Sequence, residues 1–163
     1  MKRLFVLAAA ASAAVLVVVA VNASAGHKPG RGHDHGRGHH HGATLTVVEH
    51  ATTDAVTNGS SGDAAGNILT FANDVFDAND GARVGTDQGV CTRIVVGKSW
   101  ECIWTTFLPR GQITVEGPFY DTGDSTLAIT GGTGAYRNVR GEMELKYHNP
   151  AGTEFDFVFH LIG

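Results

Sequence analysis

Residues 113–145 read ITVEGPFYDTGDSTLAITGGTGAYRNVRGEMEL, a pattern of strand, turn, strand, glycine-rich corner and strand. Side chains alternate in residues 113–118 and 126–130, and this period of two predicts two half-buried strands. Residues 121–124 (DTGD) predict the turn between them, because Asp and Gly tolerate the bent and left-handed backbones of turns. A third strand is predicted at residues 142–147. This unit can pair on both sides with the other strands of the chain.

The sequence Gly131-Gly132-Thr133-Gly134 could be mistaken for a phosphate-binding loop. It lacks the Lys-Ser/Thr pair of a P-loop, and Arg137 stands where a dinucleotide-binding fingerprint has Gly. We interpret the run as a corner between strands. The chain also lacks the sequence patterns of serine hydrolases, zinc proteases and EF-hands, so we expect no cofactor.

The rest of the chain is also predicted to be strands. After the N-terminal apolar run, no segment has a convincing helical period. About eight short strands with Gly-rich turns predict an all-β barrel or sandwich, and a closed barrel of eight strands can hold one small ligand. Further strands are expected at residues 43–50, 68–76, 84–96 (interrupted at 87–89), 99–108 and 153–162, with a short strand within 51–57. One face should carry Trp100, Cys102, Trp104 and Thr106, and another Phe155, Phe157, Phe159 and Leu161.

The N-terminus is predicted to be a secretory signal peptide, residues 1–25. Lys2 and Arg3 precede an apolar run, and Ala23-Ser24-Ala25 is a small-x-small cleavage site. A retained membrane anchor is the alternative, since the run is close to the length needed to span a bilayer. We expect cleavage after Ala25, a secreted protein, and no membrane association afterwards.

Residues 26–42, GHKPGRGHDHGRGHHHG, have no apolar side chain to anchor them and predict a flexible linker before a folded domain at 43–163. Neutral imidazoles ligate Zn, Cu or Ni, so one hypothesis is that this linker binds a divalent metal. The alternative is a solvated, pH-sensitive tether. The candidate metal ligands are His33, His35, His39, His40 and His41.

The charge of the folded domain excludes one class of partner. From Ala43 onward, 7 basic and 15 acidic residues give a net charge of −8. Binding to phosphates needs clustered Lys and Arg, so nucleic acid is not an expected partner.

Two cysteines, Cys91 and Cys102, flank a predicted hairpin with its turn near Gly97. A turn centred on Val96-Gly97 places the cysteines opposite each other, and an exported protein favours a disulfide. Closing a loop of about ten residues stabilises the fold by roughly 2–3 kcal/mol. Two free thiols are the alternative.

Glu49 shares one face of the first strand with Leu45 and Val47. If that face is interior, burial raises the pKa of Glu49 unless a partner compensates its charge. The alternative is an acidic residue at a strand end that reaches solvent.

The chain resembles plant allene oxide cyclases closely over 113–145, and dirigent proteins more distantly. The shared features are GQITVEGPF, the run DSTLAITGGTGAYRNVRGEMEL, GVC at 89–91, FAND at 71–74 and the terminal aromatic strand. The resemblance covers most of the chain from Thr44 onward. It implies an eight-stranded antiparallel barrel with an apolar cavity, a fold that is often a homotrimer.

The resemblance also implies roles for individual residues. Glu49 matches a glutamate that assists epoxide opening, Cys91 a cysteine that shapes the cyclisation, and Asn73 an asparagine that holds a water. Phe119 stands where the family has a cavity tyrosine, and Tyr120 is adjacent. We therefore expect Glu49 and Cys91 as catalytic residues, with Asn73, Phe119 and Tyr120 binding ligand.

Three hypotheses for function follow. The first is a secreted isomerase or cyclase that acts on a small apolar molecule in the barrel, with Glu49 as the electrostatic group. The second is a dirigent-like binding module without catalysis, and a disulfide at Cys91 favours it over the first. The third is metal capture by the His-rich linker. Ala51 and Cys102 depart from the allene oxide cyclase pattern, so true allene oxide cyclase activity is not expected.

Overall fold

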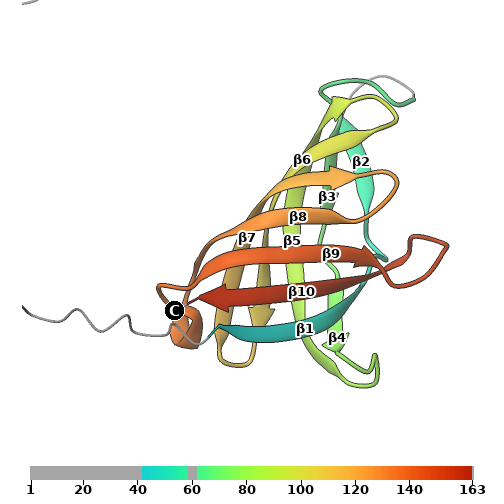
Figure 1. Ribbon diagram of the computed structural model, residues 1–163. Helices are drawn as coiled ribbons and strands as arrows, with labels where there is room; N and C mark the ends of the chain where they lie inside the picture. Colours follow the sequence, from blue (N-terminus) through green and yellow to red (C-terminus); the bar gives the residue numbers. More distant parts are fainter. Residues whose placement is uncertain (1–41, 59–61, 163) are drawn as a thin grey trace, which may run out of the picture. The chain divides into compact units, whose positions relative to one another are not determined.

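The wall of the barrel is one antiparallel sheet that closes on itself. The computed structural model describes residues 42–58 and 62–162, and Figure 1 shows the strands wrapped around a common interior. Eight strands follow around the ring in the order β5, β4, β1, β10, β9, β8, β7, β6, and β6 pairs again with β5. The predicted eight-stranded antiparallel barrel is confirmed. The elements are β1 (Ala43–His50), β2 (Ala55–Asn58), β3 (Ile68–Phe71), β4 (Asp74–Asp77), β5 (Arg83–Val95), β6 (Ser99–Leu108), β7 (Gly111–Tyr120), β8 (Ser125–Gly132), the 3₁₀ turn η1 (Gly134–Tyr136), β9 (Arg140–Tyr147) and β10 (Glu154–Ile162).

Strand β5 closes the ring with different partners along its two edges. One edge pairs with β6 throughout, whereas the other pairs with β4 over its first half and with β3 over its second half. The single strand predicted at 68–76 is therefore two strands. At the break, the backbones of Asn73 and Asp87 exchange hydrogen bonds of 3.1 and 2.9 Å. This break brings two polar residues to the interior at one point of the wall.

Gly89 does not interrupt β5, although residues 87–89 were expected to do so. The strand runs unbroken from Arg83 to Val95, and Gly89 pairs with Trp104 of β6. A Cβ atom at Gly89 would press on the Cβ of Trp104 and lie 2.7 Å from the Phe71 ring. The glycine is needed because two aromatic side chains approach the backbone closely, and not because the strand ends there.

The core follows the predicted alternation of strand side chains. Trp100, Cys102, Trp104 and Thr106 of β6 are all buried, and so are Phe155, Phe157 and Phe159 of β10. Successive strand residues point to opposite faces of a sheet, so each strand contributes every second side chain to the interior. Burying aromatic side chains is a large favourable term, and here it fixes which face of each strand lies inward.

The glycine-rich corner has the structure expected from its sequence. Strand β8 ends at Gly132, and the chain turns through η1 into β9. Gly134 has a φ of 60°, in the left-handed region that favours glycine. A Cβ atom there would press on the carbonyl oxygen of Arg110. The corner needs glycine for its backbone shape and for close packing, and it is not followed by a helix that could hold a phosphate.

The hairpin of β5 and β6 carries a disulfide. Cys91 and Cys102 are paired residues of the two strands, and they are bonded with a Cα–Cα distance of 4.0 Å. Gly97 in the turn has a φ of 66°. The predicted hairpin and disulfide are both confirmed.

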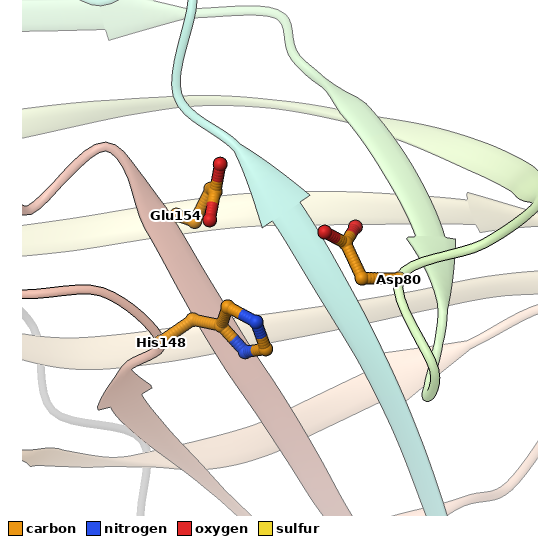
Figure 2. A group of neighbouring side chains, drawn as sticks. All are labelled: Asp80, His148 and Glu154. Carbon is orange, nitrogen blue, oxygen red and sulfur yellow. The ribbon is translucent and has the colours of Figure 1, made fainter.

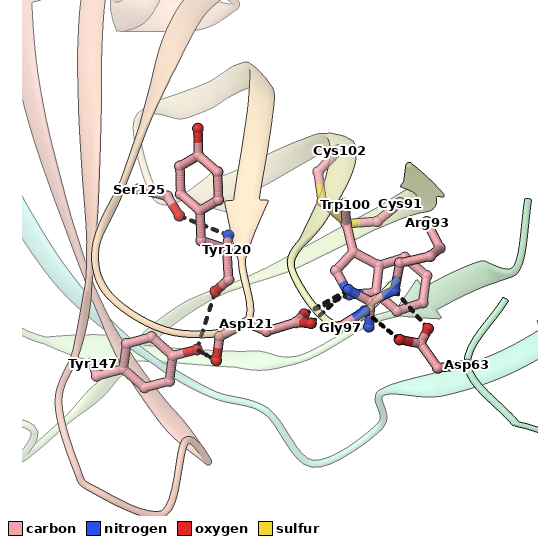
Figure 3. A network of polar contacts seen from close by, with 10 residues as sticks. All are labelled: Asp63, Cys91, Arg93, Gly97, Trp100, Cys102, Tyr120, Asp121, Ser125 and Tyr147. Carbon is pink, nitrogen blue, oxygen red and sulfur yellow. Dashed lines mark hydrogen bonds and ion pairs between the residues drawn. A yellow bond between two sulfur atoms is a disulfide. The ribbon is translucent and has the colours of Figure 1, made fainter. Parts of the chain in front are cut away.

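A second cross-link, around Arg93, lies beside the disulfide (Figure 3). Arg93 is 7% exposed, and its Nη1 donates to both carboxylate oxygens of Asp121 at 2.7 Å. Its Nε lies 2.7 Å from the carboxylate of Asp63, and its guanidinium lies 3.9 Å above the ring of Trp100. The hydroxyl of Tyr147 donates to the backbone carbonyl of Asp121 at 2.9 Å. These contacts tie β5, β6, β9 and two loops together.

The predicted signal peptide, and the linker with His33, His35, His39, His40 and His41, lie outside the described residues. Secretion, the metal-binding linker and the homotrimer all stay predictions. Within residues 42–58 and 62–162, the chain forms no helix that is long and apolar enough to cross a membrane.

Candidate active site

A small cavity lies inside the barrel, between the disulfide and the β3–β4 break. Its volume is about 40 Å³, which is room for a few waters at most, since one water needs roughly 10–15 Å³. A larger guest would have to displace a wall side chain. The walls are mainly aromatic, and Trp104 contacts both Phe157 and Phe71, at ring distances of 5.5 and 6.0 Å. The lining residues are Glu49, Asp54, Leu69, Phe71, Cys91, Cys102, Trp104, Phe119, Leu145, Phe155 and Phe157.

Glu49 reaches the cavity from β1 and is 5% exposed. It pairs with Val75 of β4 and Phe155 of β10, so the backbone on both sides of it belongs to the wall. Of the two alternatives for Glu49, a buried side chain or one that reaches solvent, the structure has the buried one. Burial, followed by the nearby charge of Asp87, raises the pKa of Glu49 well above its ordinary value. Burial therefore favours the protonated form of Glu49, which can donate a proton.

Asn73 holds Glu49 in place. Its Nδ2 donates to Glu49 Oε1 and to Asp54 Oδ1, both at 2.8 Å. Its Oδ1 accepts from the backbone N–H groups of Thr52 and Thr53 at 3.1 and 2.9 Å, and from the Thr53 hydroxyl at 2.9 Å. These donors fix the orientation of the amide, since the oxygen must face them. With all of these bonds made, Asn73 positions two carboxyl groups and is not free to hold a ligand water, as the resemblance had implied.

Asp87 of β5 completes an acidic group around Asn73. It is 1% exposed, and its Oδ1 accepts from the backbone N–H of Asn73 at 3.2 Å. Burial is the main cause that raises the pKa of Asp87 to about 7, while a hydrogen bond with Glu49 lowers it. Its Oδ2 has no hydrogen-bond partner among the described residues. Burial and their nearby charges raise the pKa values of both carboxyl groups, so protonation of at least one of the two is favoured.

A polar group without a partner also belongs to the cavity wall. Trp104 is 3% exposed, and its Nε1–H has no hydrogen-bond acceptor in the described part of the chain. Buried donors are normally satisfied, so this N–H can bond an acceptor atom of a guest or a water. The cavity wall therefore combines the Glu49 carboxyl group with mostly apolar side chains, one of which carries this unpaired N–H.

The structure brings together some of the predicted site residues and separates others. Glu49 and Phe119 line the cavity, and the Phe119 ring packs edge-on against Phe155 at 5.8 Å. Tyr120 does not reach the cavity. It follows Phe119 directly on β7, so its side chain points to the opposite face of the sheet, where it is 37% exposed. Cys91 lines the cavity only as half of a disulfide, so its thiol is not available for the predicted catalytic role.

The sequence analysis missed Asp87, Asp54 and Trp104 as parts of the site. Asp87 lies four residues before Cys91, and an even spacing on one strand places both side chains on the same face. That signal was present, but the expected interruption at residues 87–89 concealed it. No sequence signal pointed to Asp54, which lies between β1 and β2 and meets Asn73 only in the folded chain.

Comparisons with known proteins agree with this architecture. A pyocyanin demethylase is 27% identical, with a TM-score of 0.62, over 72% of this chain and 100% of that one. A pterocarpan synthase dirigent protein is 21% identical, with a TM-score of 0.59, over 75% and 97% of the two chains. An exo-specific intermolecular Diels–Alderase is 16% identical, with a TM-score of 0.61, over 75% and 98%. A family profile described as allene oxide cyclase matches residues 46–161. This chain belongs to the allene oxide cyclase family.

Proposed function

We propose that this protein is an isomerase or cyclase that moves a proton on a small, largely apolar molecule held in the barrel. The observation that carries the proposal is the Glu49–Asp87 pair, two buried carboxyl groups without a cation, of which Glu49 lines an aromatic cavity. A neutral acid in an apolar site is a good proton donor near pH 7. This pair is the reacting centre of the proposed mechanism.

The proposed reaction conserves the proton. Glu49 gives its proton to the bound molecule, which becomes cationic, and the carboxylates of Glu49 and Asp87 stabilise that charge in a dry site. A proton then leaves another atom of the molecule and returns to Glu49. Bonds have moved within the molecule, and the enzyme is restored. The N–H of Trp104 is free to orient an acceptor atom of the same molecule.

The size of the cavity sets a condition for binding. A guest larger than a few waters enters only if a wall side chain rotates. Leu69, Phe71 and Phe119 are only partly buried, in contrast to Trp104 and Phe157. Partly exposed side chains change rotamer quickly. These three residues therefore form the movable part of the wall in the proposed binding step.

A dirigent-like binding module without catalysis is the second candidate. The disulfide supports it, because it removes the thiol that the resemblance had assigned to Cys91. In this case the barrel holds a reactive molecule while another protein does the chemistry. The two candidates share the ligand and differ in whether Glu49 is needed for turnover.

One experiment separates them. Purified protein is incubated with small-molecule extract from its producing culture, and liquid chromatography with mass spectrometry follows compounds that bind and compounds that change. The isomerase proposal expects a bound compound to be converted into a product of the same mass and a different retention time. Glu49→Gln should bind that compound and leave it unconverted.

The other results decide against the proposal. A compound that both proteins bind without conversion favours the binding module. Equal conversion by wild type and Glu49→Gln removes Glu49 from the mechanism. Trp104→Phe serves as a further variant, since it keeps an aromatic wall and removes only the N–H; the proposal expects weaker binding for this variant.

A further inference from the structure

A group of ionisable side chains at the rim of the barrel plays no part in the cavity chemistry. Asp80 lies in the turn between β4 and β5, His148 follows β9, and Glu154 begins β10. One ligand atom from each of them lies within 4.8 Å of the other two. Figure 2 shows one ring nitrogen of His148 turned toward the space between the two carboxylates.

Two of the three groups, His148 and Asp80, are each held by a partner side chain on the side away from the others. The Nδ1 of His148 lies 2.7 Å from a carboxylate oxygen of Asp156, which leaves Nε2 as the free ring nitrogen. The Oδ1 of Asp80 lies 2.7 Å from Nε2 of His50, and this leaves Oδ2 available. In metal centres, a ligating histidine bonds a carboxylate through its other nitrogen, and ligating carboxylates are themselves hydrogen-bonded. Both features are present here.

The backbone around the three groups is also fixed. Asp77 caps the turn that carries Asp80, accepting bonds from the N–H groups of Asn79 and Gly81 at 3.0 Å each. The backbone N–H of His148 donates to the carbonyl of Glu154 at 3.0 Å. The two turns therefore present their side chains from defined positions, although those positions are far apart in the sequence.

We propose that Asp80, His148 and Glu154 form a binding site for a divalent transition-metal ion of the zinc class. One imidazole and two carboxylates match the nitrogen and oxygen ligands of Zn²⁺, and their charges balance those of the ion. Zinc with bonds of roughly 2.0–2.2 Å needs ligand atoms about 3.4 Å apart, so the side chains must close by about 1.4 Å at most. A fourth position stays open to water.

An ion bound at this site would also stabilise the rim of the barrel. His50, behind Asp80, is the residue after Glu49, and it pairs with Glu154 across β1 and β10. An ion held here joins the turn after β4 to the turn before β10, the two strands that pair with β1 on either side. It therefore stabilises the rim next to the segment that carries Asp54.

The test uses the thermal unfolding midpoint, because an ion that binds only the folded state raises that midpoint. Ions bound by the predicted linker, residues 26–42, bind folded and unfolded chains alike if that segment is unstructured, and they give no shift. At pH 7, we expect 1 mM Zn²⁺ to raise the midpoint of wild type by roughly 4–8 °C. The same shift is expected for His160→Gln, a matched control in which an exposed β10 histidine is lost.

His148→Gln and Glu154→Gln should each lose most of this shift. The proposal is overturned if wild type shows no shift, or if both variants keep the full shift. Anomalous diffraction from zinc-soaked crystals gives a second readout that does not depend on how the variants fold. A peak between His148, Asp80 and Glu154 is expected, and peaks found only elsewhere would rule the site out.

Discussion

The inward face of β5 carries two charged side chains, six residues or roughly 20 Å apart, in opposite surroundings. Arg93 has two carboxylates and an aromatic ring around its guanidinium. Asp87 has no cation: in the described part of the chain, no ion pair includes Asp87 or Glu49. One end of the strand holds a compensated charge, and the other holds an acid whose pKa is raised to about 7.

The difference suggests a structural role for Arg93 and a chemical role for Asp87 on the same strand. A buried charge with satisfied partners fixes the geometry of a fold, and breaking it is costly. Buried acids without a counter-ion have raised pKa values, and such groups gather at functional sites. The barrel therefore locks one end of β5 and leaves the other end able to exchange a proton.

The largest expected effect is a pH dependence of the free energy of unfolding, caused by Glu49 and Asp87. Because burial raises the pKa values of Glu49 and Asp87, the folded state keeps protons that the unfolded state releases above pH ~4. The free energy of unfolding therefore falls as pH rises from about 4 to about 7. For Asp87, a pKa of about 7 against 3.8 corresponds to on the order of 4 kcal/mol.

Urea unfolding at several pH values measures this effect. Asp87→Asn removes one acid and also relieves Glu49 of a neighbouring charge, so its stability should depend less on pH than that of wild type. Parallel curves for the two proteins would mean that the pair does not bind extra protons in the folded state.

Removing the positive charge of Arg93 should lower the free energy of unfolding by about 3 kcal/mol. Arg93→Met keeps much of the buried volume but leaves Asp63 and Asp121 without their partner, and it removes the stacking on Trp100. Both carboxylates are partly exposed, so water recovers part of the loss. Denaturant unfolding at pH 7 gives the value.

Arg83→Met is the matched control for this variant. The Arg83–Asp74 pair is about half exposed on both sides, and such pairs contribute roughly 0–1 kcal/mol. Equal destabilisation by the two variants would contradict the view that Arg93 is special because its charge is buried and compensated.

The disulfide lies between the two ends, and its reduction should cost roughly 2–3 kcal/mol. The hairpin with Arg93 should open more than the end with Asp87, because the ladder with β3 ends at Thr92 and the tip of the hairpin pairs only with β6 in the described part of the chain. Hydrogen exchange with and without reductant measures this, and Cys91→Ala/Cys102→Ala is the control for effects of the reductant. Equal loss of protection at both ends would show that the disulfide stabilises the ring as a whole.

The smallest effect is expected for Glu49→Gln. Burial already favours the uncharged form of Glu49, and a glutamine oxygen can still accept the bond from Asn73. The free energy of unfolding at pH 7 should therefore stay within about 1 kcal/mol of wild type. A stabilisation of several kcal/mol would show instead that Glu49 is ionised in the folded protein.

The sequence was informative wherever one strand decides the outcome by itself. The alternation from Trp100 to Thr106 showed which side chains lie inside, and the spacing of Cys91 and Cys102 predicted their pairing. The same alternation excludes Tyr120 from the cavity, since it follows Phe119 directly. The prediction for Tyr120 was taken from the family resemblance alone and did not apply this rule.

The acidic site could not be derived in this way, because it depends on how the ring closes. Asn73 and Asp87 meet only because two short strands share one edge of β5. The burial of Glu49 depends on neighbours from β4 and β10, which are distant in sequence. Local patterns carry no information on such contacts, so both alternatives for Glu49 stayed open until the barrel was known.

The break between β3 and β4 has a practical consequence for engineering. At Ala72 the backbone N–H and carbonyl both bond the hydroxyl of Thr53, at 2.8 and 3.1 Å, in place of a neighbouring strand. Residues inserted there would sever no ladder of the sheet. The break between β3 and β4 is therefore a suitable site for inserting loops of varied sequence. Such insertions could enlarge the cavity for other ligands while the other strands of the ring keep their register.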